Sequence, residues 1–329
     1  MFFGVTGLCK QYGGTAVLRD VEFRVAQGEV VSILGPSGVG KTTLLKIIAG
    51  LERPDAGELT FRETPGKERP VLLVFQDYLL FPNLTVFENA AFGLRVRKLP
   101  RGEVRERVRG ILEYFQLWEK RREYPHQLSA GQKQRVAIAR AMVVNPMLLL
   151  LDEPFANLDR NLKLSTAEFI RDTQKTFGVT TISVTHDLEE AFVMSDRIGL
   201  LLEGRLVQFD TPGEVYAHPV SQEAAAFLGP LSELTPEARR ATGMACPERE
   251  AGASVFVRPE SVVLRADAHG PARVLHAAFA GNHVKYTVAI AGCEIAAFGP
   301  GNGEVRFLPG DRVRLEITDC LDPKAKEQS

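Results

Sequence analysis

The sequence predicts an α/β protein in which helices cover a parallel sheet, followed by a small all-β domain. A short apolar run at 30–34 and fully apolar runs at 71–75 and 147–151 alternate with helical patterns. Such runs are typical of strands buried on both faces. Beyond about residue 252 the periodicity shortens to two, with Gly and Pro turns between the segments, which indicates a small barrel. A length of 329 residues suits about two domains.

The composition excludes several classes of protein. Hydrophobic residues make up 45% and charged residues 25% of the chain, which is typical of a globular protein and not of a disordered one. Lys and Arg total 40 against 41 Asp and Glu, so a strongly basic nucleic-acid-coating chain is excluded. No apolar run approaches the ~18 residues that span a bilayer, and the N-terminus lacks a secretory pattern. We expect any membrane part to come from another chain.

The elements follow in order along the predicted first domain, residues 1–228. A helix is expected at 41–49, and a β-branched run at 180–184 predicts a further strand. A turn near Gly204 predicts a hairpin, and the residues 211–214, Thr-Pro-Gly-Glu, have the chemistry of a helix start. At about 95–143 apolar residues recur at helical spacing, which predicts a helical subdomain. Its Arg and Lys residues are interrupted by Glu, which favours a solvated face over a nucleic-acid surface.

The second domain is predicted from 253–318. Residues 229–252 are rich in Pro and Gly and are interpreted as a linker, and 319–329 as a polar tail. Strands are expected at 254–258, 272–279, 283–290, 293–298 and 312–317. The four cysteines are scattered and favour reduced thiols over a disulfide or zinc framework.

A phosphate-binding loop is predicted at 35–42, whose sequence GPSGVGKT fits G-x-x-x-x-G-K-[ST] between a strand and a helix. Inward N–H groups and the helix dipole favour a phosphate there. Lys41 is expected to reach the β- and γ-phosphates of ATP, and Thr42 to ligate Mg²⁺. The residues expected to hold the nucleotide here are Gly35, Ser37, Gly38, Gly40, Lys41, Thr42 and Thr43.

A second motif is the apolar strand 147–151 followed by Asp152 and Glu153, about 110 residues beyond the phosphate loop. Asp152 suits the Mg²⁺ shell, through water. Glu153 suits orienting or deprotonating the attacking water.

The segment 128–135, LSAGQKQR, then resembles the LSGGQ signature of ATP-binding cassette (ABC) ATPases. The family's other motifs appear in its order. They are Tyr12 for adenine stacking, Gln76 of the Q-loop, Asn157-Leu158-Asp159 of the D-loop and His186 of the switch region. The resemblance covers about residues 2–228 and implies a P-loop NTPase ABC cassette, with a RecA-like core and a helical subdomain.

The resemblance implies a head-to-tail dimer with a second copy or a related ABC ATPase. Ser129 and Gly131 of one chain would contact the γ-phosphate held by the other, with Gln132 and Asp159 at the same interface. His186 would hold the γ-phosphate, and Gln76 would touch Mg²⁺ or the attacking water. Position 130 is Ala where the signature usually has Gly. Its methyl group penalises a positive φ and takes room beside a phosphate.

The loop that runs from Gln76 to Thr85 is unusually apolar. It either packs under the helical subdomain or lines a groove for a coupling helix of a transmembrane permease, and the family resemblance favours the groove. Tyr78 and Phe81 are the residues to mutate first.

The segment Val257-Arg258-Pro259-Glu260 resembles the start of an accessory oligonucleotide-binding-like (TOBE) domain. Importer ATPases for maltose, polyamines, ferric iron, sulfate and molybdate carry such domains. The region lacks a basic, aromatic-interleaved stripe, so nucleic acid binding is rejected. A regulatory or packing role is favoured, and an anion ligand stays open.

The resemblance therefore implies the ATP-hydrolysing subunit of a binding-protein-dependent importer, peripheral on the cytoplasmic face of the inner membrane. A periplasmic solute-binding protein would act indirectly. A polyamine or ferric iron substrate is somewhat favoured, with sulfate, molybdate, sugar or export as alternatives. A non-transport ABC ATPase is disfavoured because no coiled-coil arm separates phosphate loop and signature. A small-molecule phosphotransferase would not need the signature.

Overall fold

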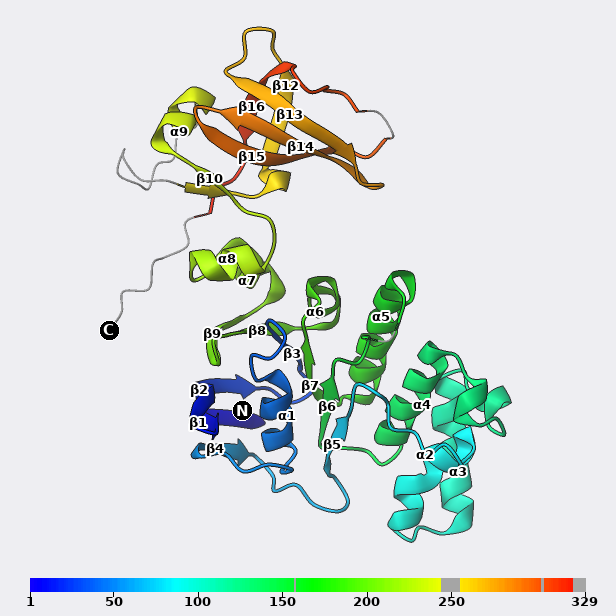
Figure 1. The fold of residues 1–329 in the computed structure, drawn as a ribbon. Helices are drawn as coiled ribbons and strands as arrows, with labels where there is room; N and C mark the ends of the chain where they lie inside the picture. Colours follow the sequence, from blue (N-terminus) through cyan, green and yellow to red (C-terminus); the bar gives the residue numbers. More distant parts are fainter. Residues whose placement is uncertain (157, 244–254, 303–304, 322–329) are drawn as a thin grey trace. The chain divides into compact units, whose positions relative to one another are not determined.

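The computed structural model describes residues 1–156, 158–243, 255–302 and 305–321. They form two compact units, Met1–Val215 and Tyr216–Ser329, whose elements are drawn in Figure 1. The unit boundary at residue 215 precedes the domain end that the sequence pattern places at residue 228. Asn157, part of the linker and the end of the tail lie outside the described residues.

The first unit is organised around a six-stranded sheet with the order β5-β6-β7-β3-β8-β9. Neighbouring strands from β5 to β8 are parallel, and β9 is antiparallel to β8. The strands are β3 (Val30–Leu34), β5 (Val71–Val74), β6 (Leu148–Asp152), β7 (Thr180–Thr185), β8 (Arg197–Leu202) and β9 (Arg205–Asp210). Strands β3, β6 and β7 are buried along their whole length. The predicted parallel sheet and the hairpin at Gly204 are confirmed.

A second, antiparallel sheet in this unit has the order β2-β1-β4 and was not predicted. Its strands are β1 (Phe3–Tyr12), β2 (Thr15–Val25) and β4 (Ala56–Phe61). Helix α1 (Lys41–Ile48) contributes Leu44, Leu45, Ile47 and Ile48 to a core shared with both sheets. This core fixes the helix that follows the phosphate loop.

The core formed by the remaining helices of the first unit includes Val30 of β3, Val74 of β5, and Leu149 and Leu151 of β6. These helices are α2 (Val86–Val96), α3 (Arg101–Tyr114), η1 (Trp118–Lys120), η2 (Pro125–Gln127), α4 (Ala130–Met142), α5 (Arg160–Phe177) and α6 (Leu188–Met194). In Figure 1, α2, α3 and α4 gather beside β5. The helical region begins at Val86 and not near residue 95, because Thr85 and Glu88 form a capping box at the start of α2.

The second unit is mainly antiparallel β-structure, as predicted. Its elements are α8 (Gln222–Phe227), β10 (Ser232–Leu234), α9 (Pro236–Thr242), β11 (Val255–Val257), η3 (Pro259–Ser261), β12 (Val262–Ala266), β13 (Ala272–Phe279), β14 (His283–Ile290), β15 (Cys293–Pro300) and β16 (Arg312–Ile317). Helix α7 (Pro212–Ala217) spans the unit boundary and starts with the expected Thr211 cap. The five-stranded sheet has the order β12-β16-β13-β14-β15, and β10 pairs with β11.

Part of the predicted linker is ordered. Thr235 caps α9, Pro236 occupies its first turn and Gly243 ends it in the left-handed region. These are the preferred residues at those positions, so the Pro and Gly that suggested an irregular linker instead bound a short helix.

Candidate functional site

The predicted site residues follow four parallel strands at one edge of the sheet. Gly35 follows β3, Asp152 ends β6, His186 follows β7, and Gln76 lies two residues beyond β5. The register pairs Leu34 with Thr185 and Asp152 with Val184. Because parallel strands end at the same edge, the fold brings these segments to the place where open α/β sheets bind ligands.

The phosphate loop connects this edge to α1. Gly40 is the N-cap residue of α1 and has a φ of 110°, which an L-residue with a side chain rarely adopts. At Gly35 a Cβ atom would lie 2.3 Å from the carbonyl oxygen of Leu201, so the close approach of β8 requires glycine. Ser37 and Gly38 are exposed at the tip of the loop. The α1 N-terminus therefore faces an open cradle.

Lys41 is buried within this cradle. Its ammonium donates to the carbonyl oxygens of Gly35 at 2.7 Å and Pro36 at 2.9 Å. Burial lowers the pKa of Lys41, while the nearby carboxylates of Glu153 and Asp152 oppose that shift. A buried ammonium so close to the helix start is suited to an anionic ligand.

The hydroxyl of Thr42 donates to Oδ1 of Asp152 at 3.0 Å. Burial raises the pKa of Asp152, and the Thr42 hydrogen bond opposes the shift. These two side chains offer hard oxygen donors of the kind that Mg²⁺ prefers. Within the described residues no cluster of three or more His, Cys, Asp or Glu side chains forms a metal site. A magnesium ion bound here would need further ligands beyond these two side chains.

Glu153 lies between Lys41 and His186. Its Oε1 is 4.0 Å from Nζ of Lys41, and its Oε2 is 3.2 Å from Nδ1 of His186. The backbone of Glu153 has a φ of 42°, and its amide donates to the carbonyl of Val184 at 3.0 Å. Such a conformation is costly in a non-glycine residue and concentrates at functional sites. It fixes the carboxylate at the end of β6.

Tyr12 and Gln76 lie at the border of this group. The ring of Tyr12 is 47% exposed, and its hydroxyl bonds to Glu52. The bond to Glu52 raises the pKa of Tyr12, while Thr43 of α1 opposes the shift, so Tyr12 lies beside the first turn of α1. Gln76, two residues beyond the end of β5, is exposed.

The signature residues form a separate group at the start of α4. Ser129 is the exposed N-cap residue and makes a capping box with Gln132. Ala130 begins the helix and is absent from the residues with positive φ. The expected backbone penalty of Ala130 was therefore wrong, because the first helical residue has a negative φ. Gly131 is buried, and a Cβ there would meet Cδ2 of Leu162 at 3.0 Å.

Asp159 caps α5 by accepting a hydrogen bond from the Leu162 amide at 3.0 Å. The hydrogen bonds of Ser129, Gln132 and Asp159 described here stay within their own helix starts. The single chain thus gathers the phosphate loop, Asp152, Glu153 and His186 in one group. The hydrogen bonds described for Ser129, Gln132 and Asp159 do not join this group.

A polar cluster beside His186 was not predicted. Thr185, Asp187 and buried Glu190 are joined by hydrogen bonds, and Lys163 of α5 pairs with both acids. A helix cap after a strand is a signal at Asp187, but sequence alone does not show that α5 lies against it.

The loop from residue 76 to 85 divides its side chains between core and surface. Tyr78 is buried in the core of the helical region, which favours the packing interpretation for this residue. Leu79 is 55%, Phe81 36% and Phe92 41% exposed, and the rings of Phe81 and Phe92 lie 4.4 Å apart. Arg140 holds the loop by donating to the carbonyls of Tyr78 and Leu79.

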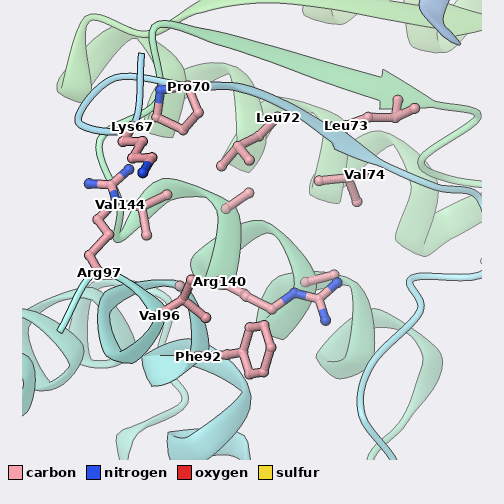
Figure 2. A pocket seen from close by; sticks show the side chains of 13 residues that line it. Lys67, Pro70, Leu72, Leu73, Val74, Phe92, Val96, Arg97, Arg140 and Val144 are labelled. Carbon is pink, nitrogen blue, oxygen red and sulfur yellow. The ribbon is translucent and has the colours of Figure 1, made fainter. Parts of the chain in front are cut away.

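A cavity of about 490 Å³ adjoins this surface between β5, α2 and α4. Figure 2 shows Phe92 and Arg140 beside it, with Leu72 and Val74 from β5. Its lining is mainly apolar, with Lys67, Arg97 and Arg140 as cations. The helices of the described residues include none long and apolar enough for a membrane span.

Comparison with known proteins identifies both parts of the chain. The ABC transporter family matches residues 18–156, and the TOBE domain family matches residues 255–320. The spermidine/putrescine import ATP-binding protein of Marinobacter nauticus is 44% identical over 244 residues. That match covers 73% of this chain and 65% of the relative.

A sulfate/thiosulfate import ATP-binding protein from Xanthomonas campestris is 39% identical over 331 residues, covering 94% of this chain and 96% of the relative. Among solved structures, a dimeric ATP-binding cassette in a post-hydrolysis state with ADP and phosphate bound is similar, with a TM-score of 0.57 and 31% identity. It covers 64% of this chain and 99% of that structure. The chain therefore belongs to the family of ATP-binding subunits of ABC transporters, with a TOBE domain after its cassette.

Proposed function

We propose that this protein is the ATP-hydrolysing subunit of a binding-protein-dependent ABC importer, working at the cytoplasmic face of the inner membrane. The observation that carries the proposal is the position of Glu153, whose carboxylate lies between Lys41 and His186. A cation, a base and a polarising group thus meet at the opening of a phosphate cradle. This combination suits transfer of a phosphoryl group to water.

The reaction is hydrolysis of the bond between the β-bridging oxygen and the γ-phosphorus of ATP. Lys41 turns from the Gly35 and Pro36 carbonyls to the phosphate oxygens. Glu153 orients the attacking water and accepts its proton, and His186 holds the γ-phosphate. Gln76 closes the side of the site nearest β5. When bound by Thr42, Asp152 and Gln76, Mg²⁺ supplies charge neutralisation for the phosphates.

Adenine stacks on Tyr12, which is exposed beside α1. Gly35, Ser37, Gly38, Gly40 and Thr43 complete the cradle. The hydrogen bonds described for Ser129, Gln132 and Asp159 do not reach the phosphate loop of their own chain. Ser129, Gly131, Gln132 and Asp159 therefore act on the nucleotide of a second cassette. The similar dimeric cassette supports this arrangement.

The permease docks on the surface formed by Leu79, Phe81 and Phe92 and on the adjoining cavity. An exposed apolar patch of this kind is typical of an interaction site. Tyr78 and Leu79 both have a positive φ. This costly backbone turn is the kind of conformation that concentrates at functional sites. Phe81 remains the residue to mutate, whereas a change at buried Tyr78 disturbs the core.

The transported solute is a small molecule delivered by a periplasmic binding protein. Two relatives of similar identity carry polyamine and sulfate in their names, so similarity of this subunit does not choose between them. The match to the sulfate/thiosulfate relative covers 94% of this chain, including the TOBE region. It supports a sulfate-type system as a candidate in addition to the polyamine and ferric iron types. Molybdate, sugar and export systems are alternatives.

The test is to co-purify the protein with its permease and measure ATP hydrolysis across a panel of polyamines, ferric chelates and oxyanions. Stimulation by one solute class, lost in Glu153→Gln, is expected. ATP hydrolysis that survives Glu153→Gln at the wild-type rate overturns the catalytic assignment. Retention of the permease by Phe81→Ala argues against the docking surface.

A further inference from the structure

The turn that carries His186 is tied to α5 by a partly buried polar cluster. Glu190 is 3% exposed, and one of its oxygens accepts a hydrogen bond from the Thr185 hydroxyl at 2.7 Å. The same hydroxyl accepts from the Asp187 amide at 3.0 Å. Thr185 and Asp187, the residues on either side of His186, are therefore hydrogen-bonded to each other.

Lys163 closes this cluster from another helix. Its ammonium lies 3.1 Å from Oε1 of Glu190 and 3.2 Å from Oδ2 of Asp187. The other oxygen of Asp187 accepts from the Glu190 amide at 3.3 Å. One lysine therefore joins the residue that follows His186 and the carboxylate that anchors the turn.

Lys163 also lies one helical turn beyond the cap of α5. Its backbone amide donates to the carbonyl of Asp159 at 3.0 Å. A covalent and hydrogen-bonded path from Asp159 to the residues beside His186 thus runs through the Lys163 side chain. Glu190 is buried, while Lys163 and Asp187 are partly exposed. Paired groups of this kind favour one geometry, because an alternative leaves the buried carboxylate without its partner.

From these contacts we propose that Lys163 is a positioning residue for His186. It keeps the imidazole beside Glu153, and it couples the position of the imidazole to the start of α5 at Asp159. The proposal rests on the hydrolytic role of Glu153 and His186 given above. Lys163 touches neither nucleotide nor water in this role. It sets where the imidazole stands and therefore affects turnover more than nucleotide binding.

The rest of α5 offers a matched control. Lys175, near the end of the same helix, forms an ion pair with Asp196. Lys163→Met and Lys175→Met each remove one positive charge from α5. Each also breaks an ion pair with at least one carboxylate outside that helix. Only the first change reaches the turn of His186.

The first measurement is steady-state ATP hydrolysis by the full chain. Lys163→Met is expected to lower kcat about tenfold to a hundredfold, because small misplacements of a reacting group cost this much. Its KM for ATP stays within about twofold. Lys163→Arg restores most of kcat, and Lys175→Met resembles wild type. A kcat of Lys163→Met near wild type, or an equal loss in Lys175→Met, overturns the proposal.

A double-mutant cycle gives a second test. Glu190→Gln keeps an acceptor for Thr185 but removes the charge that Lys163 pairs with. Since both changes break the same link, Lys163→Met combined with Glu190→Gln is expected to lose no more kcat than the worse single variant. Additive losses contradict a shared action on His186.

Amide hydrogen exchange tests the geometry without any ATP hydrolysis. The amides of Asp187 and Glu190 are expected to exchange faster in Lys163→Met and at the wild-type rate in Lys175→Met. Unchanged exchange in Lys163→Met overturns the inference. A wild-type chain without ATPase activity, but with this exchange response, overturns the proposed function and leaves the structural link supported.

Discussion

Gly35→Ala tests how the phosphate loop is held against the sheet. The added Cβ would lie 2.3 Å from the Leu201 carbonyl oxygen and 3.1 Å from Cγ1 of Val39. Gly35 is not among the glycines with positive φ, so the penalty is steric. Forcing an atom into such a contact costs about 1–3 kcal/mol. In a unit of this size each 1 kcal/mol lowers Tm by about 2–4 °C, which gives a decrease of about 2–12 °C.

Thermal unfolding measured by differential scanning fluorimetry checks this decrease. Gly110→Ala is the control, because Gly110 lies within α3 and a Cβ there meets no atom within 4 Å. It is expected to raise the free energy of unfolding by about 0.5–1 kcal/mol. Gly35→Ala is also expected to weaken ATP binding, since the Gly35 carbonyl holds Lys41. A Tm for Gly35→Ala at or above that of wild type refutes the steric reasoning.

Three further changes test other parts of the structure. Lys41→Ala is expected to lower ATP turnover about 10²-fold or more, measured by phosphate release; unchanged turnover removes the phosphate-loop assignment. Ala130→Gly is expected to leave activity intact or raise it while lowering Tm by about 2–4 °C, and a collapse of activity would show that the signature needs this methyl group. Burial raises the pKa of Glu190, and the negative charge of Asp187 raises it further. The hydrogen bonds from Thr185 and Lys163 oppose this shift. The folded state therefore holds the proton more tightly, and the stability contributed by Glu190 is lost as pH rises from about 4.5. As pH rises from about 4.5, the Tm of wild type should therefore fall relative to the Tm of Glu190→Gln. A Tm difference that does not change with pH contradicts this prediction.

The sequence predicted the sheet that positions the site because its strands are unusually clear. Strands β3, β6 and β7 are buried on both faces, so β3 and β6 appear as short apolar runs and β7 as a run rich in β-branched residues. The motif residues follow those runs directly. Their convergence at one edge then comes from parallel pairing alone.

Other features depend on tertiary contacts that no local pattern reports. Strand β1 carries register irregularities against both of its neighbours, which obscure its alternation. The role of Lys163 becomes visible only when α5 packs against α6. The helical region was predicted to begin near residue 95, and the capping box of Thr85 and Glu88 that starts α2 at Val86 was missed. Ala130 was judged by a backbone conformation that the helix start does not require.

The central claim is that two cassettes share each ATP, and the structure of the Glu153→Gln variant with Mg²⁺ and ATP tests it most directly. Removing the proton acceptor should trap a dimer in which the γ-phosphate lies between Lys41 of one protomer and Ser129 of its partner. An ATP complex in which Ser129 of both protomers stays far from every γ-phosphate contradicts the account.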